Sequence, residues 1–252
     1  MYVDPLMRIL EQQNTVESTF ATQKTAAKNG VFEVNPEQTL VLLVDFKNDG
    51  HSIYPFVKSQ LAPFREKGYL TYFDGNTTIP GPITVVATGN APFDDVIADS
   101  SYRDIFFDAP LDRLYKEGDS SSPPSPSSSP SDAHIELPIH TSGQGTVGTS
   151  PTSHFDPTNS FYASVDFKKA VGWVWLGQLS DVQMERIRGH VRGAREAGLK
   201  ARYWGTPSWP VGVRNKVWKV LVEEGVEYLN GDDLRGMTTV DWGVRRHWGW
   251  FG

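Results

Sequence analysis

Apolar and polar positions along the chain form two kinds of segment, and each kind predicts a different element. Short continuous apolar runs indicate buried strands, whereas apolar positions three and four residues apart indicate helices with one covered face. Strand-like runs occur six times, at residues 40–46, 83–88, 104–108, 161–166, 199–204 and 226–230. The helical spacing predicts helices at the N-terminus, where Leu6, Ile9 and Leu10 share a face, and at 52–67, 180–197 and 213–224.

Local signals place the ends and breaks of two of these helices. Pro63 should kink or break the helix predicted over 52–67. Ser180, with Gln183 three residues later, has the pattern of a capping box, and Gly198 follows the last turn of the same helix. Strands that alternate with helices predict an α/β fold with parallel strands.

Two α/β architectures fit this order of elements. A doubly wound open sheet would carry a Gly-rich phosphate-binding turn, and no such motif occurs in the sequence. A (β/α)₈ barrel would place functional residues at the carboxyl ends of several strands. Polar or aromatic residues do occur there, namely Asp45, Lys47, Thr88 to Asn90, Asp108, Asp166, Lys168, Trp204, Asn230 and Asp232. Only six strands are predicted, however, whereas this kind of barrel needs eight.

The first strand, LVLLVDFKND at 40–49, raises the sharpest question about a site. Its apolar run predicts a strand buried on both faces, and it ends on Asp45 and Lys47. Judged from the residues alone, these two charges fit either a solvated ion pair in a turn or a site at the mouth of a barrel. Asp108 and Asp166, which end two other strands, are candidate acids at the same rim.

One segment is of low complexity. Residues 120–131 contain only Ser and Pro, and the bias continues weakly through Gly, Thr and Ser. Such a composition cannot bury enough apolar surface to offset the entropy of ordering. We expect 117–157 to be a disordered insertion within one domain that spans 1–252, because the same strand and helix pattern occurs on both sides.

Composition narrows the class of protein. The net charge is −6 and no basic stripe occurs, so nucleic acid is not an expected partner. The chain has no Cys, which excludes disulfides, thiolate metal sites and cysteine nucleophiles. No apolar run is long enough to predict a transmembrane segment. The compartment and the oligomeric state stay open.

Six stretches together resemble a known family. They are LVLLVDFKND, YLTYFDG, GPITVVATGN, RDIFFDAPLDRL, FYASVDFKKAVGW and LKARYWGTP. In this order they resemble the fungal altered inheritance of mitochondria protein 6 family, over about residues 1–119 and 158–243. That family belongs to the PLC-like phosphodiesterase superfamily, with glycerophosphodiester phosphodiesterases and sphingomyelinase D. The resemblance implies an incomplete TIM barrel, in which the six strands correspond to the third to eighth.

The resemblance also implies roles for four residues. Asp45 resembles a carboxylate ligand of the family's divalent cation, usually Mg²⁺, and Lys47 resembles the lysine that faces the substrate phosphate. Trp204 and Asn230 resemble residues of the headgroup pocket. The implied activity is metal-dependent hydrolysis or lyase cleavage of a phosphodiester, with a glycerophosphodiester or lysophospholipid as the substrate class.

The family's catalytic histidine pair and its Glu-x-Asp have no counterpart before Asp45. We therefore expect an N-terminally truncated chain that lacks the first two barrel strands and has little or no activity alone. The alternative is a non-catalytic barrel remnant that acts as a binding or scaffold protein.

The remaining histidines and tryptophans predict structural roles. His51 falls at a helix start, and His190 lies among arginines on an expected solvent face. We expect four tryptophans to be packing residues, namely Trp173, Trp175, Trp209 and Trp218. The C-terminal RRHWGWFG is typical of either a membrane-interface foot or a docked tail.

Overall fold

The computed structural model describes residues 2–15, 28–118 and 145–239, and the chain divides into two compact units. The first unit comprises Met1–Ala109 and Ser142–Phe161. The second comprises Pro110–Thr141 and Tyr162–Gly252. Both units mix helices with parallel strands, so the predicted α/β class is confirmed.

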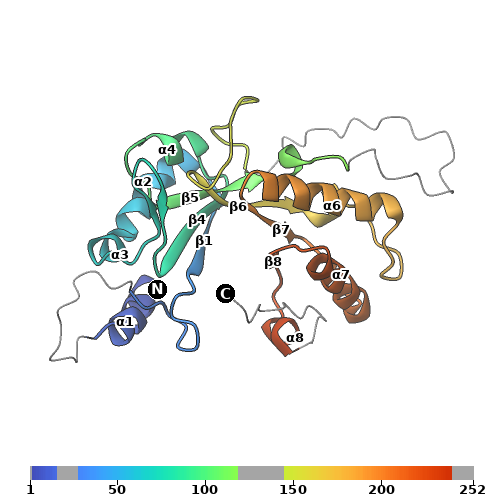
Figure 1. Cartoon of the computed structure of the whole chain (residues 1–252), viewed down its shortest axis with the longest axis horizontal. Helices are drawn as coiled ribbons and strands as arrows, with labels where there is room; N and C mark the ends of the chain where they lie inside the picture. The colour runs from blue at the N-terminus through green and yellow to red at the C-terminus, as the bar shows by residue number, and fades with distance from the viewer. Residues whose placement is uncertain (1, 16–27, 119–144, 240–252) are drawn as a thin grey trace, which may run out of the picture. The chain divides into compact units, whose positions relative to one another are not determined.

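In the first unit, three parallel strands lie side by side in chain order (Figure 1). They are β1 (Leu40–Phe46), β4 (Ile83–Gly89) and β5 (Ile105–Pro110). Its helices are α1 (Val3–Gln13), α2 (Gly50–Gln60), α3 (Ala62–Glu66) and α4 (Phe93–Ile97). A small antiparallel pair, β2 (Tyr72–Phe73) and β3 (Thr78–Ile79), completes the unit.

In the second unit, β7 pairs in parallel with β6 on one side and with β8 on the other. These strands are β6 (Ser160–Asp166), β7 (Lys200–Trp204) and β8 (Tyr228–Leu229). The helical elements are η1 (Leu111–Leu114), α5 (Phe167–Ala170), α6 (Asp181–Glu196), α7 (Val211–Glu223) and α8 (Leu234–Thr239).

The local predictions are confirmed where the sequence carried a specific signal. All six predicted strands form, with shifts of at most two residues at their ends. The helix predicted over 52–67 breaks into α2 and α3 beside Pro63. Ser180 and Gln183 form the expected reciprocal capping box at the start of α6.

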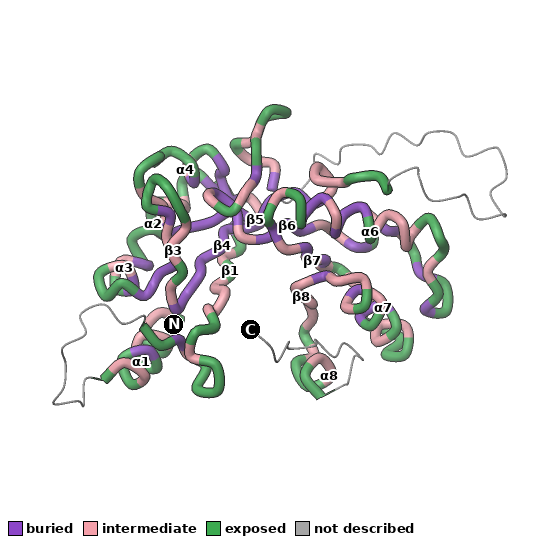
Figure 2. Tube along the Cα trace, viewed as in Figure 1, coloured by how far each residue is buried: buried purple, intermediate pink, exposed green. Residues whose placement is uncertain are grey.

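The prediction that β1 is buried on both faces is wrong. Every residue of β4 up to Thr88 is buried, whereas in β1 only Phe46 is buried and Leu43 is exposed (Figure 2). The reason is position, because β1 is the terminal strand of the order found in the described residues. A run of Leu and Val cannot distinguish a terminal strand from a central one.

The predicted solvent position of His190 is also wrong. Its ring is 1% exposed, and Nδ1 lies 2.9 Å from the Tyr203 hydroxyl of β7. Burial lowers the pKa of His190 to about 4, and Arg186 adds to the shift. His190 therefore helps to attach α6 to the face of β7 that carries Tyr203. The arginines next to His190 in the sequence are typical of a solvent-exposed helix face, so the sequence did not indicate this buried environment.

The expected insertion at 117–157 is only partly described, because 119–144 lie outside the described residues. Of the remainder, Phe155 is buried, and its ring centroid lies 5.0 Å from that of Phe93 and 6.0 Å from that of Phe107. The Phe93 amide donates to the Val147 carbonyl at 3.0 Å. These contacts attach 145–157 to α4 and β5 within the first unit.

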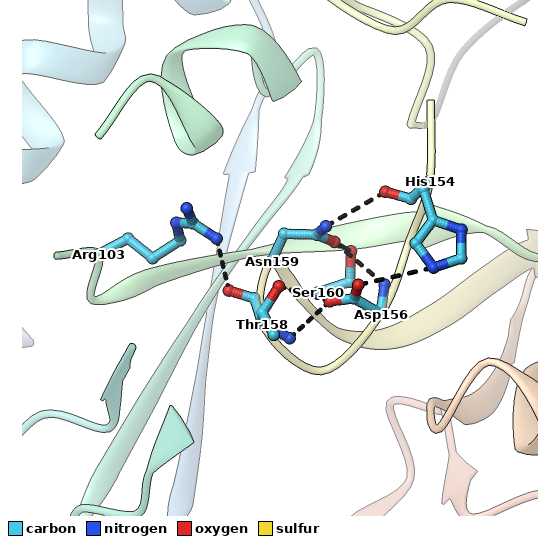
Figure 3. Close-up of polar contacts among 6 residues, drawn as sticks. All are labelled: Arg103, His154, Asp156, Thr158, Asn159 and Ser160. Atoms are coloured by element: carbon cyan, nitrogen blue, oxygen red, sulfur yellow. Dashed lines mark hydrogen bonds and ion pairs between the residues drawn. The ribbon is translucent and has the colours of Figure 1, made fainter. Parts of the chain in front are cut away.

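The amino ends of the strands in the first unit carry a polar network. Arg103 donates to the Thr158 carbonyl at 2.8 Å, and the loop around Thr158 is held by Asp156 and Asn159 (Figure 3). The Arg65 guanidinium on α3 donates hydrogen bonds to both carboxylate oxygens of Asp104, the residue that directly precedes β5. The Asp104 side chain is 2% exposed and that of Arg65 is 25% exposed, so the carboxylate is buried and the guanidinium is partly buried.

Within residues 2–15, 28–118 and 145–239, we find no helix with the length and apolar character that a membrane crossing requires.

Candidate functional site

Asp45 and Lys47 lie together at the carboxyl end of β1. The Lys47 Nζ is 2.6 Å from Asp45 Oδ2, and the two side chains are 80% and 43% exposed, respectively. A pair this open to water contributes little to folding, about 0–1 kcal/mol. Its charges remain accessible to a ligand, and a lysine ammonium is a compact point charge suited to a phosphate.

The neighbouring strand β4 shapes the space around this pair. Asp45 is in register with Thr88, and Phe46 is in register with Gly89. Gly89 has a φ of 71°, and a Cβ there would overlap both Asp45 Oδ1 and the Phe46 carbonyl oxygen. Only glycine therefore lets the two strand ends approach this closely.

Asn90 holds the turn that presents Lys47. Its backbone amide donates to the Phe46 carbonyl at 2.8 Å, and its Nδ2 donates to the carbonyls of Lys47 and Asn48 at 3.2 Å each. We did not predict this positioning role, although 88–90 was noted as a polar strand end. A bond from a side chain to a backbone 43 residues away leaves no local signal in the sequence.

A buried acid continues the row of strand ends. Asp108 is fully buried in β5, and its Oδ2 accepts a hydrogen bond from Thr88 Oγ1 at 2.6 Å. A buried carboxylate needs such donors because desolvation is costly. Asp108 was a candidate acid at the rim, but its side chain is buried and does not contact solvent.

Among the described residues, the partners of His51 are two acids of α4, and neither Asp45 nor Lys47 is one of them. Its Nδ1 lies 3.0 Å from Asp95 Oδ2, and its Nε2 lies 3.8 Å from Asp94 Oδ1. The hydrogen bond to Asp95 raises the pKa of His51 above its usual value. As predicted, His51 stands in the first turn of a helix, α2.

Asp45 alone does not complete a site for Mg²⁺, which prefers about six oxygen ligands in octahedral geometry. In the described part of the chain, no three His, Asp or Glu side chains are grouped so that they could hold a metal ion. Lys47 also places a positive charge on Asp45, in competition with a cation. The described residues therefore do not fit a tightly bound metal ion.

Trp204 and Asn230, the predicted headgroup residues, both belong to the second unit. Asn230 Oδ1 accepts a hydrogen bond from Arg202 at 2.5 Å, and Arg202 lies 5.4 Å from the centre of the Tyr162 ring. Trp204 Nε1 is buried and has no hydrogen-bond partner in the described residues. A buried indole N–H without a partner is uncommon and costs stability.

Asp166, the other candidate rim acid, acts locally. It is the N-cap of α5, and its Oδ1 accepts from the Lys169 amide at 3.2 Å. This contact explains why an acid ends β6 without any need for a ligand, because N-caps are commonly Asp.

The chain is similar to proteins that are named after one family. A family model described as an AIM6-like phosphodiesterase domain matches residues 1–108. An altered inheritance of mitochondria protein 6 homolog from Arthroderma benhamiae is 34% identical, over 93% of this chain and 62% of its own length. Altered inheritance of mitochondria protein 6 from Eremothecium gossypii is 30% identical, over 93% of this chain and 53% of its own length.

The same protein from Kluyveromyces lactis is also 30% identical, over 93% of this chain and 57% of its own length. No solved structure matches the chain. Across these three relatives, the chain spans between 53% and 62% of their length. The chain is thus similar to altered inheritance of mitochondria protein 6 proteins over most of its own length, and its residues 1–108 match the model described as an AIM6-like phosphodiesterase domain.

Proposed function

We propose that the chain carries the phosphate-binding part of a phosphoric diester hydrolase or lyase. The observation that carries the proposal is the open Asp45–Lys47 pair, because it stands at the carboxyl end of a parallel strand inside the segment that matches a phosphodiesterase domain. In α/β proteins, ligands bind at the carboxyl ends of the strands. The substrate class we propose is a glycerophosphodiester or a lysophospholipid.

In this proposal, Lys47 donates to a non-bridging phosphate oxygen and offsets its negative charge. Asn90 holds the backbone that presents Lys47, and Gly89 leaves space for the Asp45 carboxylate. Trp204 and Asn230 are proposed to contact the headgroup, because Trp204 ends β7 and Asn230 directly follows β8, each at the carboxyl end of a parallel strand.

The fold proposed for the family context is a PLC-like TIM barrel of which this chain supplies the third to eighth strands. Parallel strands that neighbour one another in chain order support this within each unit. So do α6 and β7, which are joined through His190 and Tyr203 as a covering helix and its strand.

We also propose that this chain alone turns over phosphodiesters slowly and binds Mg²⁺ weakly. General acid–base groups each contribute about 10²–10⁴-fold to such reactions, and His51, which follows β1, is engaged by Asp94 and Asp95. Asp45 would offer the metal an oxygen ligand, but a single carboxylate paired with Lys47 does not form a strong site.

Ligand binding tests the phosphate site separately from turnover. We expect glycerophosphocholine to bind the purified chain in a calorimetric titration, and Lys47→Ala to weaken binding about tenfold, because one charge-assisted contact is lost. Lys58→Ala is the matched control, since Lys58 is another exposed lysine of the first unit. If Lys47→Ala and Lys58→Ala bind equally well, Lys47 is not the phosphate ligand.

A turnover assay tests the second part of the proposal. We expect hydrolysis of glycerophosphocholine or lysophosphatidylcholine near background, with or without Mg²⁺. Mg²⁺-dependent turnover that Asp45→Ala abolishes would overturn the low-activity claim and keep the phosphodiesterase assignment. Absence of both turnover and phosphodiester binding would favour a scaffold or an unrelated binding role.

A further inference from the structure

Three tryptophans that we expected to be packing residues are exposed, so that prediction is wrong for them. Trp173, Trp175 and Trp209 are 72% to 79% exposed, whereas Trp218 is buried as expected. Trp173 and Trp175 follow β6 and α5, and Trp209 follows β7. Together with the exposed Leu176, they form what we call the tryptophan surface of the second unit.

The two segments that carry this surface also line one cavity. It has a volume of about 450 Å³, and the three tryptophans line it together with Val174, Pro207, Pro210 and Val213. A contiguous apolar surface of this kind on a folded protein usually marks an interaction site. The residues that line the cavity all belong to the second unit, and neither Asp45 nor Lys47 is among them.

The tryptophan surface rests on an ordered base. Gln183 Nε2 donates to the carbonyls of Val171 at 3.1 Å and Trp173 at 2.9 Å. Arg186 donates to the Ala170 carbonyl at 2.9 Å, and Val174 is buried beneath the surface. The backbone is therefore attached to α6 while the indole rings point into solvent, so the exposure is a feature of the folded unit.

Positive charges outnumber negative ones around the surface, although Asp166 and Asp181 flank the stretch from 167 to 180. Residues 167–180 and 205–216 contain Lys168, Lys169, Arg214 and Lys216 and no Asp or Glu, in a chain whose net charge is −6. Arg214 is neutralised by Asp233 at 2.8 Å. The three lysines are exposed, and Lys216 Nζ donates to the Leu176 carbonyl at 3.3 Å. The surface thus combines apolar rings with a net positive charge from its lysines.

We propose that the tryptophan surface docks on an anionic phospholipid bilayer. Indole rings favour the boundary between water and acyl chains because they are apolar with one polar N–H. Lysines on the same face are attracted by anionic headgroups, while their methylene stems lie along apolar groups. Rings that are 72% to 79% exposed and belong to the same segments as exposed lysines suit the interface of an anionic bilayer. The proposal goes beyond the phosphodiesterase assignment and does not depend on it.

Sedimentation of the full chain with lipid vesicles tests the docking. We expect binding to vesicles of phosphatidylcholine with phosphatidylserine, with a blue shift of tryptophan emission, and much weaker binding to phosphatidylcholine alone. The variant Trp173→Ser/Trp175→Ser/Trp209→Ser should lose at least about tenfold in partitioning, because the buried apolar area sets the affinity. Phe56→Ser is the matched control, since Phe56 is an equally exposed aromatic on α2 of the first unit.

A charge variant tests the second half of the proposal. Lys168→Gln/Lys169→Gln should weaken binding to anionic vesicles by on the order of tenfold and leave binding to neutral vesicles unchanged, given the contribution of each lysine near such a surface. Quenching of the wild-type emission by brominated lipids adds a measurement that needs no substitution.

Three results would overturn the proposal. The first is equal vesicle binding by the wild type and the triple tryptophan variant. The second is no binding or quenching with anionic vesicles. The third is a chain that does not bind vesicles but uses the three tryptophans for self-association or for binding a proline-rich peptide.

Discussion

The two ends of the strands in the first unit carry ion pairs of similar chemistry in opposite environments. At the amino end, Arg65 binds the almost fully buried Asp104, and Tyr102 also donates to this carboxylate, at 3.2 Å. At the carboxyl end, Asp45 and Lys47 pair in the open. The buried pair is committed to the fold, because either partner alone would be an uncompensated charge. The open pair costs the fold little and is free to meet a ligand.

This difference is what the proposed function requires. Barrels and open α/β sheets alike place binding groups at the carboxyl ends of strands and stabilising groups at the amino ends. The first unit follows this division, with the Arg103 and Thr158 network at its amino end. Substitutions at either end of the strands test whether the two ion pairs differ in this way.

The largest effect is expected at the amino end. Asp104→Ala should lower the free energy of unfolding by about 3–5 kcal/mol, because it leaves the Arg65 guanidinium without its carboxylate. Denaturant unfolding of the variant and the wild type measures this loss. A cost as small as that of Asp45→Ala would show that burial does not distinguish the two pairs.

The second unit extends the comparison to histidines. Burial lowers the pKa of His190 to about 4, so between pH 6.5 and about 4 the unfolded chain binds more protons than the folded one. This contribution to stability is full above pH 6.5 and is lost as pH falls, to a total of about 3 kcal/mol. His51 has the opposite sign: its pKa is raised, so its contribution is present at low pH and is lost as pH rises.

Unfolding across this pH range separates the two histidines. His190→Gln should have a shallower loss of stability from neutral to acidic pH than the wild type, by about 2–3 kcal/mol. His51→Gln should change the acid limb little. Parallel pH profiles of His190→Gln and the wild type would mean that His190 is not held neutral by its surroundings.

A smaller effect is expected where Gly89 meets the site. Gly89→Ala should cost at least about 1–2 kcal/mol, since alanine is strained at a φ of 71° and its Cβ would overlap the Phe46 carbonyl oxygen. It should also weaken phosphodiester binding, because the new Cβ would displace the Asp45 carboxylate. Gly212→Ala is the matched control, as no heavy atom lies within 4 Å of a Cβ there. Unchanged binding by Gly89→Ala would show that the spacing at Asp45 does not matter.

Much of the fold could be predicted from the sequence, because its signals are local. The six apolar runs, Pro63 and the Ser180–Gln183 box all act within a few residues of themselves. The environment of single residues could not be predicted in the same way. His190 faces β7 despite its arginine neighbours, and Trp173 faces solvent despite its apolar character.

The candidate site shows the same limit. The charge pattern located Asp45 and Lys47, and the structure pairs them. Their supports, Gly89 and Asn90, arise from the register of β1 with β4, which joins residues more than 40 positions apart. Such long-range pairing is set by packing, and a single sequence carries no short-range record of it.

Substitution of Lys47 is expected to have the smallest effect on stability and the largest effect on binding. It is therefore the most direct test of the proposed phosphate site. Lys47→Ala should change the free energy of unfolding by no more than about 1 kcal/mol, because the pair is exposed. The same variant should bind glycerophosphocholine about tenfold more weakly than the wild type, measured by calorimetry on the same preparations. A variant that binds as tightly as the wild type would contradict the account, and so would one whose weaker binding only reflects a loss of folded protein.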